Sequence, residues 1–282
     1  KDTLFSPLLV EKVREALSRG EQAILFQNRR GFAPMIECRG CGWVPHCVNC
    51  DVSLTYHKAH NQLVCHYCGY TYRLPQVCPE CKGTEFKMQG FGTEKVEEEI
   101  AGQFPAAKVE RLDFDTARTR TAYERIISDF EKGKTQILIG TQMLSKGLDF
   151  GNVSVVGILS ADSLMNFPDF RAHERAYQLM VQVSGRAGRR DKRGTVILQT
   201  TQPEHPLIRM VQHFAYKEMV SLQLSERSMF RYPPYYRLIV LILRSRNEEA
   251  LQEMSALYAE KLRARLGERV LGPVPPPITR VQ

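Results

Sequence analysis

The sequence predicts an α/β fold built on a parallel sheet, with a cysteine-rich module inserted into it and a partial α+β domain after it. Three observations support this prediction. Near-continuous apolar runs alternate with amphipathic helical stretches, all eight cysteines fall within residues 38–81, and the pattern changes past residue 200. Apolar strands separated by helices are typical of a parallel sheet with helices on both faces.

The elements of the expected sheet domain can be followed along the chain. A helix that ends at Gly20 leads into a strand at 21–28, and 32–37 is expected to be the next strand. After the cysteines, a helix at 93–104 has Thr93 at its N-cap and glutamates near its start, as suits a helix N-terminus. Further helices are expected at 121–133 and 171–185, and strands at 108–114, 136–142, 153–162 and 194–200. This order indicates a RecA-like lobe.

The same patterns divide the chain into three domains. The RecA-like lobe is discontinuous and covers residues 1–36 and 86–225. The cysteine-rich insert covers 37–85, and residues 226–282 begin a further domain with the order strand, helix, strand. We expect the chain to be a fragment, because a helix starts at its first residues and the last domain stops after a strand start.

The composition and charge of the chain argue against some classes of protein and favour others. Hydrophobic residues make up 43% of the 282 residues, charged residues 25%, and the formal net charge is +8. No apolar run approaches the roughly 18–20 residues that span a bilayer, and no signal peptide opens the chain, so we expect a cytoplasmic protein without membrane contact. A basic chain favours an acidic partner such as nucleic acid.

The cysteines form four C-x-x-C pairs, a spacing that lets both sulfurs of a pair face one tetrahedral ion. Disulfides would need an oxidising, secreted context, which nothing in the sequence supports. Eight thiolates make two Cys₄ zinc sites, and the four nearby histidines are interpreted as surface or supporting residues. The pairs are Cys38/Cys41, Cys47/Cys50, Cys65/Cys68 and Cys78/Cys81, and the histidines are His46, His57, His60 and His66.

The spacing between pairs predicts which of them share an ion. Fourteen residues separate Cys50 from Cys65, and they read as strand, polar turn, strand. The two middle pairs therefore close a hairpin around one zinc, and the two outer pairs bind the second zinc at its base. This nested arrangement brings together the points where the chain enters and leaves the insert. Each Cys₄ site carries a formal charge of about −2, so two sites lower the net charge to about +4.

Two further stretches contain residues that suit the binding of phosphate groups. QVSGRAGRR, residues 182–190, places two arginines three positions apart beside glycines, which suits stabilisation of charge during phosphoryl transfer. The alternative is a solvated basic turn. GTQMLSKGLDFGNV, residues 140–153, begins as a strand and ends in small, polar residues, and ligands bind at the carboxyl ends of parallel strands.

Together these stretches resemble motifs V and VI of superfamily 2 helicases. ILFQNRRGF, residues 24–32, resembles motif IV, and GFGTEKVEEEI, residues 90–100, resembles the phosphate-binding turn that follows it. With the four-pair insert between those two, the chain resembles the C-terminal half of the PriA family of bacterial replication-restart helicases. The resemblance implies a RecA-like second helicase lobe and a ribosomal-protein-like fold for the last domain.

The resemblance also implies roles for individual residues. Two arginines match the motif VI residues that reach ATP phosphates and are the expected catalytic pair, Arg186 and Arg189. Expected nucleotide-binding residues are Gln182, Gly147 and Asp149. Expected DNA-phosphate contacts are Thr93, Thr141, Arg29 and Arg30.

As a family member, the chain is expected to be part of an ATP-dependent 3′-to-5′ DNA helicase that recognises stalled or abandoned forks and restarts replication by primosome assembly. Implied partners are forked and single-stranded DNA, primosome proteins and single-stranded DNA-binding protein, and implied cofactors are two structural zinc ions, with ATP and Mg²⁺ held together with the first lobe. A monomer associated with the bacterial nucleoid is expected. The alternative is a zinc-stabilised DNA or protein interaction module without a motor.

A motor also needs a Walker A loop, G-x-x-x-x-G-K-[ST], which this sequence does not contain. The one GKT tripeptide, Gly133-Lys134-Thr135, has Ser128 where the first glycine should stand, and it follows a helix instead of a strand. We interpret it as a decoy. The fragment is therefore expected to lack the ATPase lobe and the N-terminal DNA-binding part of the family, and to be inactive as an enzyme alone.

The segment FRYPPYYRL, residues 230–238, leaves two interpretations open. Tyr232, Tyr235 and Tyr236 beside Arg231 could stack on bases of a single strand. Aromatics flanked by prolines more often pack as a domain hinge. The single tryptophan, Trp43, could face a partner or pack over the zinc.

Overall fold

The structure is a computed structural model, and it describes residues 3–27, 35–57, 61–65, 67–88, 93–113, 116–145, 150–188, 194–245 and 247–274. By its internal contacts the chain divides into two units, which are described separately. The first, here called the sheet unit, contains residues 1–32, 90–165 and 173–219. The second, the zinc unit, contains residues 33–89, 166–172 and 220–282. The zinc unit thus combines the cysteine-rich insert with two segments far away in the sequence.

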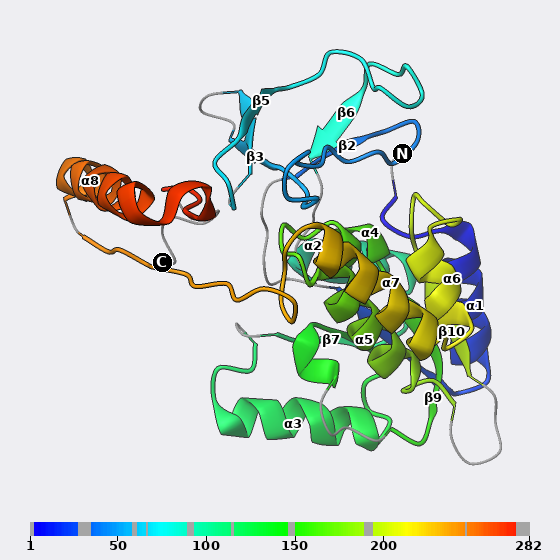
Figure 1. Cartoon of the computed structure of the whole chain (residues 1–282). Helices are drawn as coiled ribbons and strands as arrows, with labels where there is room; N and C mark the ends of the chain where they lie inside the picture. The colour runs from blue at the N-terminus through cyan, green and yellow to red at the C-terminus, as the bar shows by residue number, and fades with distance from the viewer. Residues whose placement is uncertain are drawn as a thin grey trace. The chain divides into compact units, whose positions relative to one another are not determined.

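The sheet unit contains a five-stranded sheet with the strand order β10-β9-β1-β8-β7. Its two edge strands, β7 and β10, are labelled in Figure 1. Every neighbouring pair is parallel, which confirms the predicted sheet type. The central strand has all five positions buried, as expected for a strand covered on both faces. The strands are β1 (Gln22–Phe26), β7 (Val109–Leu112), β8 (Ile137–Gly140), β9 (Val153–Ile158) and β10 (Thr195–Leu198).

Helices follow most of these strands, as a parallel sheet requires. They are α1 (Pro7–Ser18), α2 (Thr93–Gln103), α3 (Arg120–Glu131), α4 (Ala161–Met165), α5 (Ala172–Ser184) and α6 (Pro206–Gln212), with a short 3₁₀ turn, η1 (Gln142–Ser145). A further helix, α7 (Tyr216–Met229), begins in the sheet unit, and its residues from 220 on belong to the zinc unit. Ser6 caps α1 and Pro7 fills its first turn, where a missing N–H does no harm. Thr119 caps α3 in the same way. Thr93, expected at an N-cap, is instead the first residue of α2.

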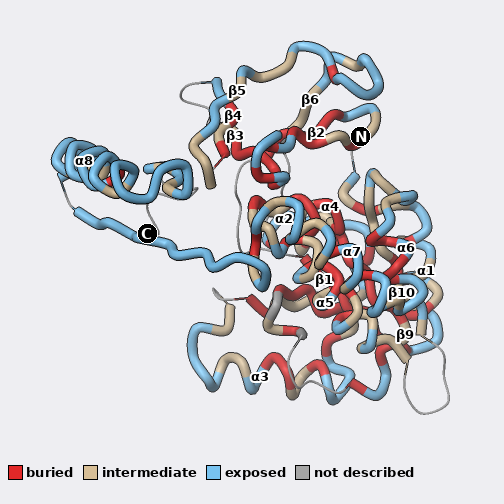
Figure 2. Tube along the Cα trace, viewed as in Figure 1, coloured by how far each residue is buried: buried red, intermediate tan, exposed pale blue. Residues whose placement is uncertain are grey.

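One face of the sheet forms a continuous apolar core with α1 and α2. Leu9 and Val13 on α1 and Val96 and Ile100 on α2 are fully buried against side chains of β1, β8 and β9. Burial of aliphatic side chains at about 25 cal/mol per Å² is the main stabilising contribution to such a layer. The core appears in Figure 2 as the red segments of the strands and of the helices that pack on them.

The zinc unit contains only short strands. β2 (Ile36–Cys38) pairs antiparallel with β6 (Phe86–Met88), and β3 (Thr55–His57), β4 (Gln62–Val64) and β5 (Thr71–Arg73) form a three-stranded antiparallel sheet. The strand expected at 32–37 therefore does not extend the parallel sheet. Its described part pairs Ile36 with Met88 and joins the two ends of the insert, as the nested arrangement predicts.

The described part of the C-terminal region contains α8 (Glu248–Leu266) and a 3₁₀ turn, η2 (Gly267–Arg269). This helix is the one expected in the order strand, helix, strand. The apolar segments on either side of it, 237–245 and 269–274, were expected to be the strands, but they are unpaired in the structure. A strand forms only when a second chain segment accepts its backbone hydrogen bonds, and the described residues supply none here. Ile239 is 83% exposed, and Figure 2 shows 237–245 and α8 almost entirely in pale blue.

The part of the chain that the structure describes contains no helix that is both long and apolar enough to cross a membrane.

Candidate functional site

The eight cysteines lie in two groups of four sulfurs. The outer site comprises Cys38, Cys41, Cys78 and Cys81, and the inner site comprises Cys47, Cys50, Cys65 and Cys68. Within each group the sulfurs lie within 4.8 Å of one another, and none forms a disulfide. This is the pairing that the spacing predicts.

The sulfur positions fit a tetrahedral zinc ion. A Zn–S bond of about 2.3 Å places two sulfurs of a tetrahedron about 3.8 Å apart, whereas a disulfide needs about 2.0 Å. The Sγ atoms of Cys38 and Cys81 are 3.5 Å apart, and those of Cys41 and Cys78 are 3.6 Å apart. At the inner site the Sγ atoms of Cys47 and Cys68 are 3.6 Å apart. The donor set at both sites suits zinc.

The same backbone turn, or knuckle, occurs at each of the four C-x-x-C pairs. The residue after the second cysteine donates its N–H to the carbonyl of the first cysteine at 2.9–3.0 Å, and the first cysteine donates its own N–H to a carbonyl five residues on at 2.7–2.9 Å. The first bonds are Gly42 to Cys38, Asp51 to Cys47, Gly69 to Cys65 and Lys82 to Cys78. The chain thus builds one ligand-presenting turn four times.

Each knuckle places the residue after its second cysteine in the left-handed region, with φ between 51° and 78°. Glycine suits this conformation at Gly42 and Gly69. In the last knuckle the strained residue is Lys82 and not the neighbouring Gly83. No glycine in the sequence marks the left-handed position of Asp51, although aspartate tolerates this region better than most residues.

Hydrogen-bond donors lower the pKa of some of the eight cysteine thiols. Burial raises the pKa of the Cys38 thiol, but N–H donors from Cys41 and Gly40 lower it, to about 7. At the inner site the Cys50 thiol and the amides of Cys68 and Tyr67 lower the pKa of Cys65 to about 5. The thiolate is the form that binds metal. In the same two groups burial raises the pKa of Cys41 and of Cys47, each to about 12, so only some of the sulfurs are favoured as thiolates in this way.

The two sites differ in their surroundings. Three inner-site sulfur residues, Cys47, Cys50 and Cys65, belong to an apolar cluster with residues such as Leu54 and Leu63. At the outer site Cys81 is exposed. His46, interpreted as a surface residue, places its Nε2 3.2 Å from the Ser53 hydroxyl, and no histidine joins either group among the described residues. The described part of the structure does not include His60, His66 or the side chain of His57.

In the sheet unit, the turn that carries Arg186 lies beside the segment that follows motif V. The amide of Gly188 donates to the carbonyl of Val153, the first residue of β9, at 3.1 Å. A Cβ on Gly194 would lie 2.4 Å from backbone atoms of Ala187 and Gly188, so only glycine lets the chain approach this closely. The described ends of the 140–153 and 182–190 stretches therefore meet at the amino end of β9.

The expected nucleotide-binding residues are partly described. Arg186 is half-buried just after α5, and Gln182 is exposed near the end of that helix. Arg189, Gly147 and Asp149 lie outside the described residues, so their positions stay predictions. The segment that follows Asp149 is the one whose Val153 carbonyl receives the Gly188 amide.

The expected DNA contacts lie at the carboxyl end of the sheet as far as they are described. Thr141 directly follows β8 and is buried, and its carbonyl accepts a hydrogen bond from Leu144 at 2.9 Å. Gly140 before it leaves space for Leu144, which a Cβ would approach to 2.3 Å. Arg29 and Arg30 lie outside the described residues.

The hydroxyl of Thr93 has a partner that the sequence did not reveal. It donates to the carboxylate of Asp113 at 2.6 Å, and both residues are almost fully buried. Asp113 follows β7 and also accepts the amide of Thr116 at 3.0 Å, while Arg111 lies 3.3 Å away. The Thr93 hydroxyl therefore links α2 to the residue that follows β7. The expected contact with a DNA phosphate would then be made by backbone N–H groups at the start of α2.

Comparison with known families matches three parts of the chain. The family described as PriA DNA helicase Cys-rich region (CRR) domain matches residues 47–73, and the helicase conserved C-terminal domain matches 86–191. The primosomal protein N C-terminal domain matches 228–282. Two of these three descriptions are specific to one family, and they surround a helicase lobe in the expected order.

Curated relatives match the chain almost from end to end. The chain is 44% identical to the replication restart protein PriA of Bacillus subtilis (strain 168), a match that covers 99% of this chain and 35% of that protein. It is 41% identical to the protein of the same name from Synechocystis, over 99% of this chain and 34% of that protein. The chain belongs to the PriA family. It spans about a third of the length of these relatives.

Solved structures add little to this assignment. The second domain of the DEAD-box helicase Mss116p bound to an RNA duplex aligns with 93% of this chain and 75% of that one, at 13% identity and a TM-score of 0.38. That score is too low to support an argument, and the PriA assignment rests on the sequence matches.

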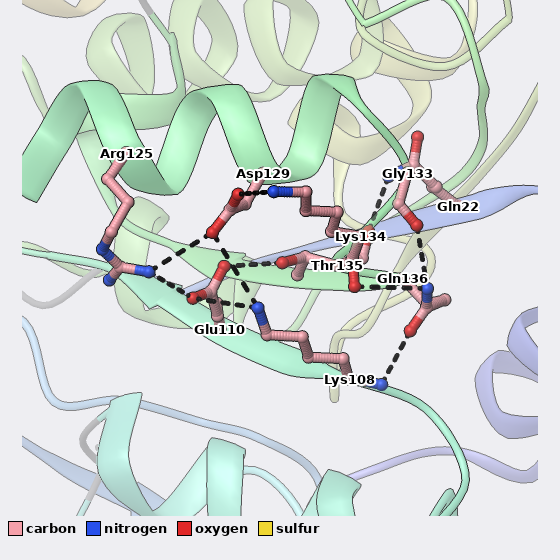
Figure 3. Close-up of polar contacts among 9 residues, drawn as sticks. All are labelled: Gln22, Lys108, Glu110, Arg125, Asp129, Gly133, Lys134, Thr135 and Gln136. Atoms are coloured by element: carbon pink, nitrogen blue, oxygen red, sulfur yellow. Dashed lines mark hydrogen bonds and ion pairs between the residues drawn. The ribbon is translucent and has the colours of Figure 1, made fainter.

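The GKT tripeptide of this PriA-family chain lies in a polar network at the amino ends of β7 and β8 (Figure 3). The Thr135 hydroxyl donates to Glu110 at 2.5 Å, and Lys134 lies 3.3 Å from Asp129. Arg125 joins the two carboxylates, at 2.9 Å from Glu110 and 3.5 Å from Asp129. Lysine and threonine are thus held by protein carboxylates, in agreement with the interpretation of GKT as a decoy.

The aromatic residues of 230–238 divide into two kinds. Tyr232 is buried, so its ring is not exposed to stack on a nucleic-acid base. Tyr235 and Tyr236 are 53% and 51% exposed, and for them the base-stacking interpretation stays open. Trp43 is half-buried, and its carbonyl accepts the amide of Cys38 at the outer site.

Proposed function

We propose that this chain supplies the second motor lobe and the zinc module of an ATP-dependent 3′-to-5′ DNA helicase that recognises stalled or abandoned forks and restarts replication by primosome assembly. The PriA family assignment supports the role in replication restart. The observation that carries the motor assignment is the bond from Gly188 to Val153, which holds the Arg186 turn beside the segment that leaves motif V.

In this proposal the Arg186 turn acts on ATP held by a first lobe. Arg186 and Arg189 present guanidinium groups to the phosphates and stabilise the charge that develops as the γ-phosphoryl group leaves. Gln182, Gly147 and Asp149 position the nucleotide and connect it to the DNA. Mg²⁺ and a Walker A loop belong to the rest of the protein, because this sequence contains no such loop.

The DNA strand is proposed to pass along the carboxyl ends of the strands. Thr141 follows β8 there, α2 begins there at Thr93, and Arg29 and Arg30 follow β1 in the sequence. Amides at a helix N-terminus suit a phosphate, and such contacts carry no base specificity. Thr93 and Thr141, the described members of this proposed track, lie at the opposite end of the strands from the Gly188–Val153 junction.

Two zinc ions are proposed to hold the zinc unit in one conformation. The zinc unit then offers a surface to primosome proteins, single-stranded DNA-binding protein or the fork itself, and the protein acts as a monomer. Zinc bound by four thiolates has no open position, so its contribution is structural.

Unwinding of forked DNA by the full-length protein tests the motor assignment. We expect ATP-dependent strand displacement on forks that carry a 3′ single-stranded tail and little on forks with only a 5′ tail. Fork binding without ATP hydrolysis would instead support an interaction module without a motor. A preference for the 5′ tail would contradict the proposed polarity.

Charge-removing variants test the proposed DNA track. Arg30→Ala with Thr141→Val should weaken binding to single-stranded DNA similarly for different base sequences and should lower its salt dependence, since each phosphate contact contributes about one unit to the salt slope. Arg120→Ala removes the same charge on α3, where the side chain is 90% exposed, and serves as the control. Equal effects of both changes, or a strong base-sequence preference, would contradict the track.

A further inference from the structure

Tyr232 joins two parts of the zinc unit that are far apart in the sequence. Its side chain is only 7% exposed, and its hydroxyl donates to the carbonyl of Cys50 at 2.9 Å across 182 residues. Cys50 is the second cysteine of an inner-site knuckle. A buried hydroxyl paired with a buried carbonyl makes a specific contact, because either group left alone would be costly.

The ring of Tyr232 contacts the other inner-site knuckle as well. It meets the ring of Tyr67 edge-on, with centroids 5.9 Å apart and an angle of 76°. Tyr67 lies between Cys65 and Cys68, which supply the remaining two sulfurs of the inner site. Tyr232 therefore touches both knuckles that would hold the inner ion.

A third segment completes the arrangement. Phe170 stacks on Tyr232 with centroids 4.5 Å apart and planes within 10°. The guanidinium of Arg227, near the end of α7, lies 5.2 Å from the centre of the Phe170 ring, and its Nη1 donates to the carbonyl of Pro233 at 3.4 Å. Stacked aromatic pairs and cations over aromatic rings each add to the energy of plain burial.

We infer that Tyr232 is a positioning residue that latches the segment 227–236 onto the inner zinc site, so that zinc occupancy and the docking of this segment stabilise each other. The latch comprises Tyr67, Phe170, Arg227 and Tyr232 with the Cys50 carbonyl. Because such coupling is reciprocal, loss of inner zinc frees the segment that leads to α8, and loss of the latch weakens inner zinc. The inference rests on the zinc assignment of the proposed function and not on the motor assignment.

Zinc affinity tests the first direction. In the full-length protein, competition with a chelator gives the affinity of each site, and Cys65→Ser and Cys81→Ser identify which transition belongs to which site. Tyr232→Phe keeps the ring and removes the hydroxyl, so inner-site affinity should fall about tenfold, the equivalent of one buried hydrogen bond. Tyr232→Ala should lower it at least about a hundredfold. Outer-site affinity should not change.

Tyr235→Phe is the matched control, because Tyr235 lies in the same segment but is half exposed. It should leave both affinities unchanged. Equal weakening of both sites by Tyr232→Phe would indicate general destabilisation. Unchanged inner-site affinity in both Tyr232 variants would show that Tyr232 does not support the inner site. Each outcome overturns the inference.

Proteolysis tests the reverse direction. Arg231 is exposed and directly precedes buried Tyr232, so tryptic cleavage after Arg231 reports release of the latch. Cleavage followed by mass spectrometry should be about tenfold faster in Cys65→Ser, which empties the inner site, and unchanged in Cys81→Ser. Equal rates in the two variants would contradict the coupling.

The zinc assignment and the latch can fail separately. Fewer than two zinc ions per wild-type chain would overturn the zinc assignment itself. Two ions with inner-site affinity unaffected by Tyr232→Phe and Tyr232→Ala would leave the proposed zinc sites intact and overturn the latch alone.

Discussion

In the sheet unit, β1 is buried at all five positions and α1 and α2 cover one face of the sheet with fully buried aliphatic residues. In the zinc unit, each of the strands that the structure describes has three residues, and three of the seven buried residues of its apolar cluster are cysteines. The core of the first unit is built from aliphatic side chains, whereas the apolar cluster of the second is built around candidate metal ligands. A cluster of this kind is expected to depend on bound metal.

Metal removal should give the largest difference between the units. Structural zinc contributes on the order of 10 kcal/mol to folding at neutral pH, so Cys65→Ser should release one ion and unfold the β3–β5 sheet. The parallel sheet should stay folded. Elemental analysis gives the ion count, and hydrogen exchange measures amide protection in β4 and in β8. Joint loss of protection in both strands would show that the units do not fold independently.

The next effect belongs to the sheet unit. Arg186→Ala or Arg189→Ala in the full-length protein should lower ATP turnover at least about a hundredfold, since an arginine finger acts mainly in the transition state. DNA binding without nucleotide should change little. Lysine at position 189 should not restore turnover, because an ammonium lacks the planar guanidinium fork.

Arg120→Ala, an exposed change on α3, should leave ATP turnover unaffected and serves as the control. Normal turnover with impaired DNA binding in Arg189→Ala would place the basic turn on the nucleic-acid surface instead.

Local patterns of this sequence predicted local structure well. The alternation of apolar runs and helices predicted the parallel sheet, and the x-x spacing with a 14-residue hairpin predicted how the sulfurs group. Both features depend on neighbours a few positions apart. The left-handed Asp51 was missed because no glycine marks it, although its knuckle repeats the other three.

Contacts between distant segments could not be predicted in the same way. The Thr93–Asp113 bond spans 20 residues and the Tyr232–Cys50 bond spans 182, and neither partner carries a local signal for the other. The apolar pattern of 237–245 predicted a strand, but strand formation requires a pairing partner, which a pattern in one segment cannot reveal. The contacts of Thr93 and Tyr232 and the pairing of 237–245 therefore depend on tertiary structure, which a local sequence pattern does not reveal.

A smaller effect should distinguish the buried network of the sheet unit from its surface. Thr135→Val removes the donor to Glu110 and should lower the free energy of unfolding by about 1–3 kcal/mol, because a carboxylate loses a partly buried hydrogen bond. Lys134→Ala removes an ion pair whose lysine is 63% exposed, and should cost about 0–1 kcal/mol. Urea unfolding measures both. Loss of ATP hydrolysis in Lys134→Ala would contradict the decoy interpretation.

The smallest expected effect is a gain of stability in the zinc unit. Burial, and then the nearby charge of Asp51, raise the pKa of Glu226 above its ordinary value of 4.5. The folded state therefore binds this proton more tightly than the unfolded state, and Glu226 lowers stability as the pH rises from about 4.5 through the raised pKa. The formal negative charge of a Cys₄ zinc site acts in the same direction.

Glu226→Gln keeps an acceptor for Gln223, whose Nε2 donates to this side chain at 2.6 Å, and removes the charge. At pH 7 the variant should be more stable by at most about 1 kcal/mol, since solvent screens this half-buried group. Thermal release of zinc into a chelating dye, measured from pH 5 to pH 8, should show an advantage that shrinks toward acidic pH because both side chains are then neutral. Glu253→Gln, at an exposed position on α8, should give no such pH-dependent difference. An advantage that grew toward acidic pH would mean that the folded unit favours the Glu226 carboxylate, and would reverse the sign argued here.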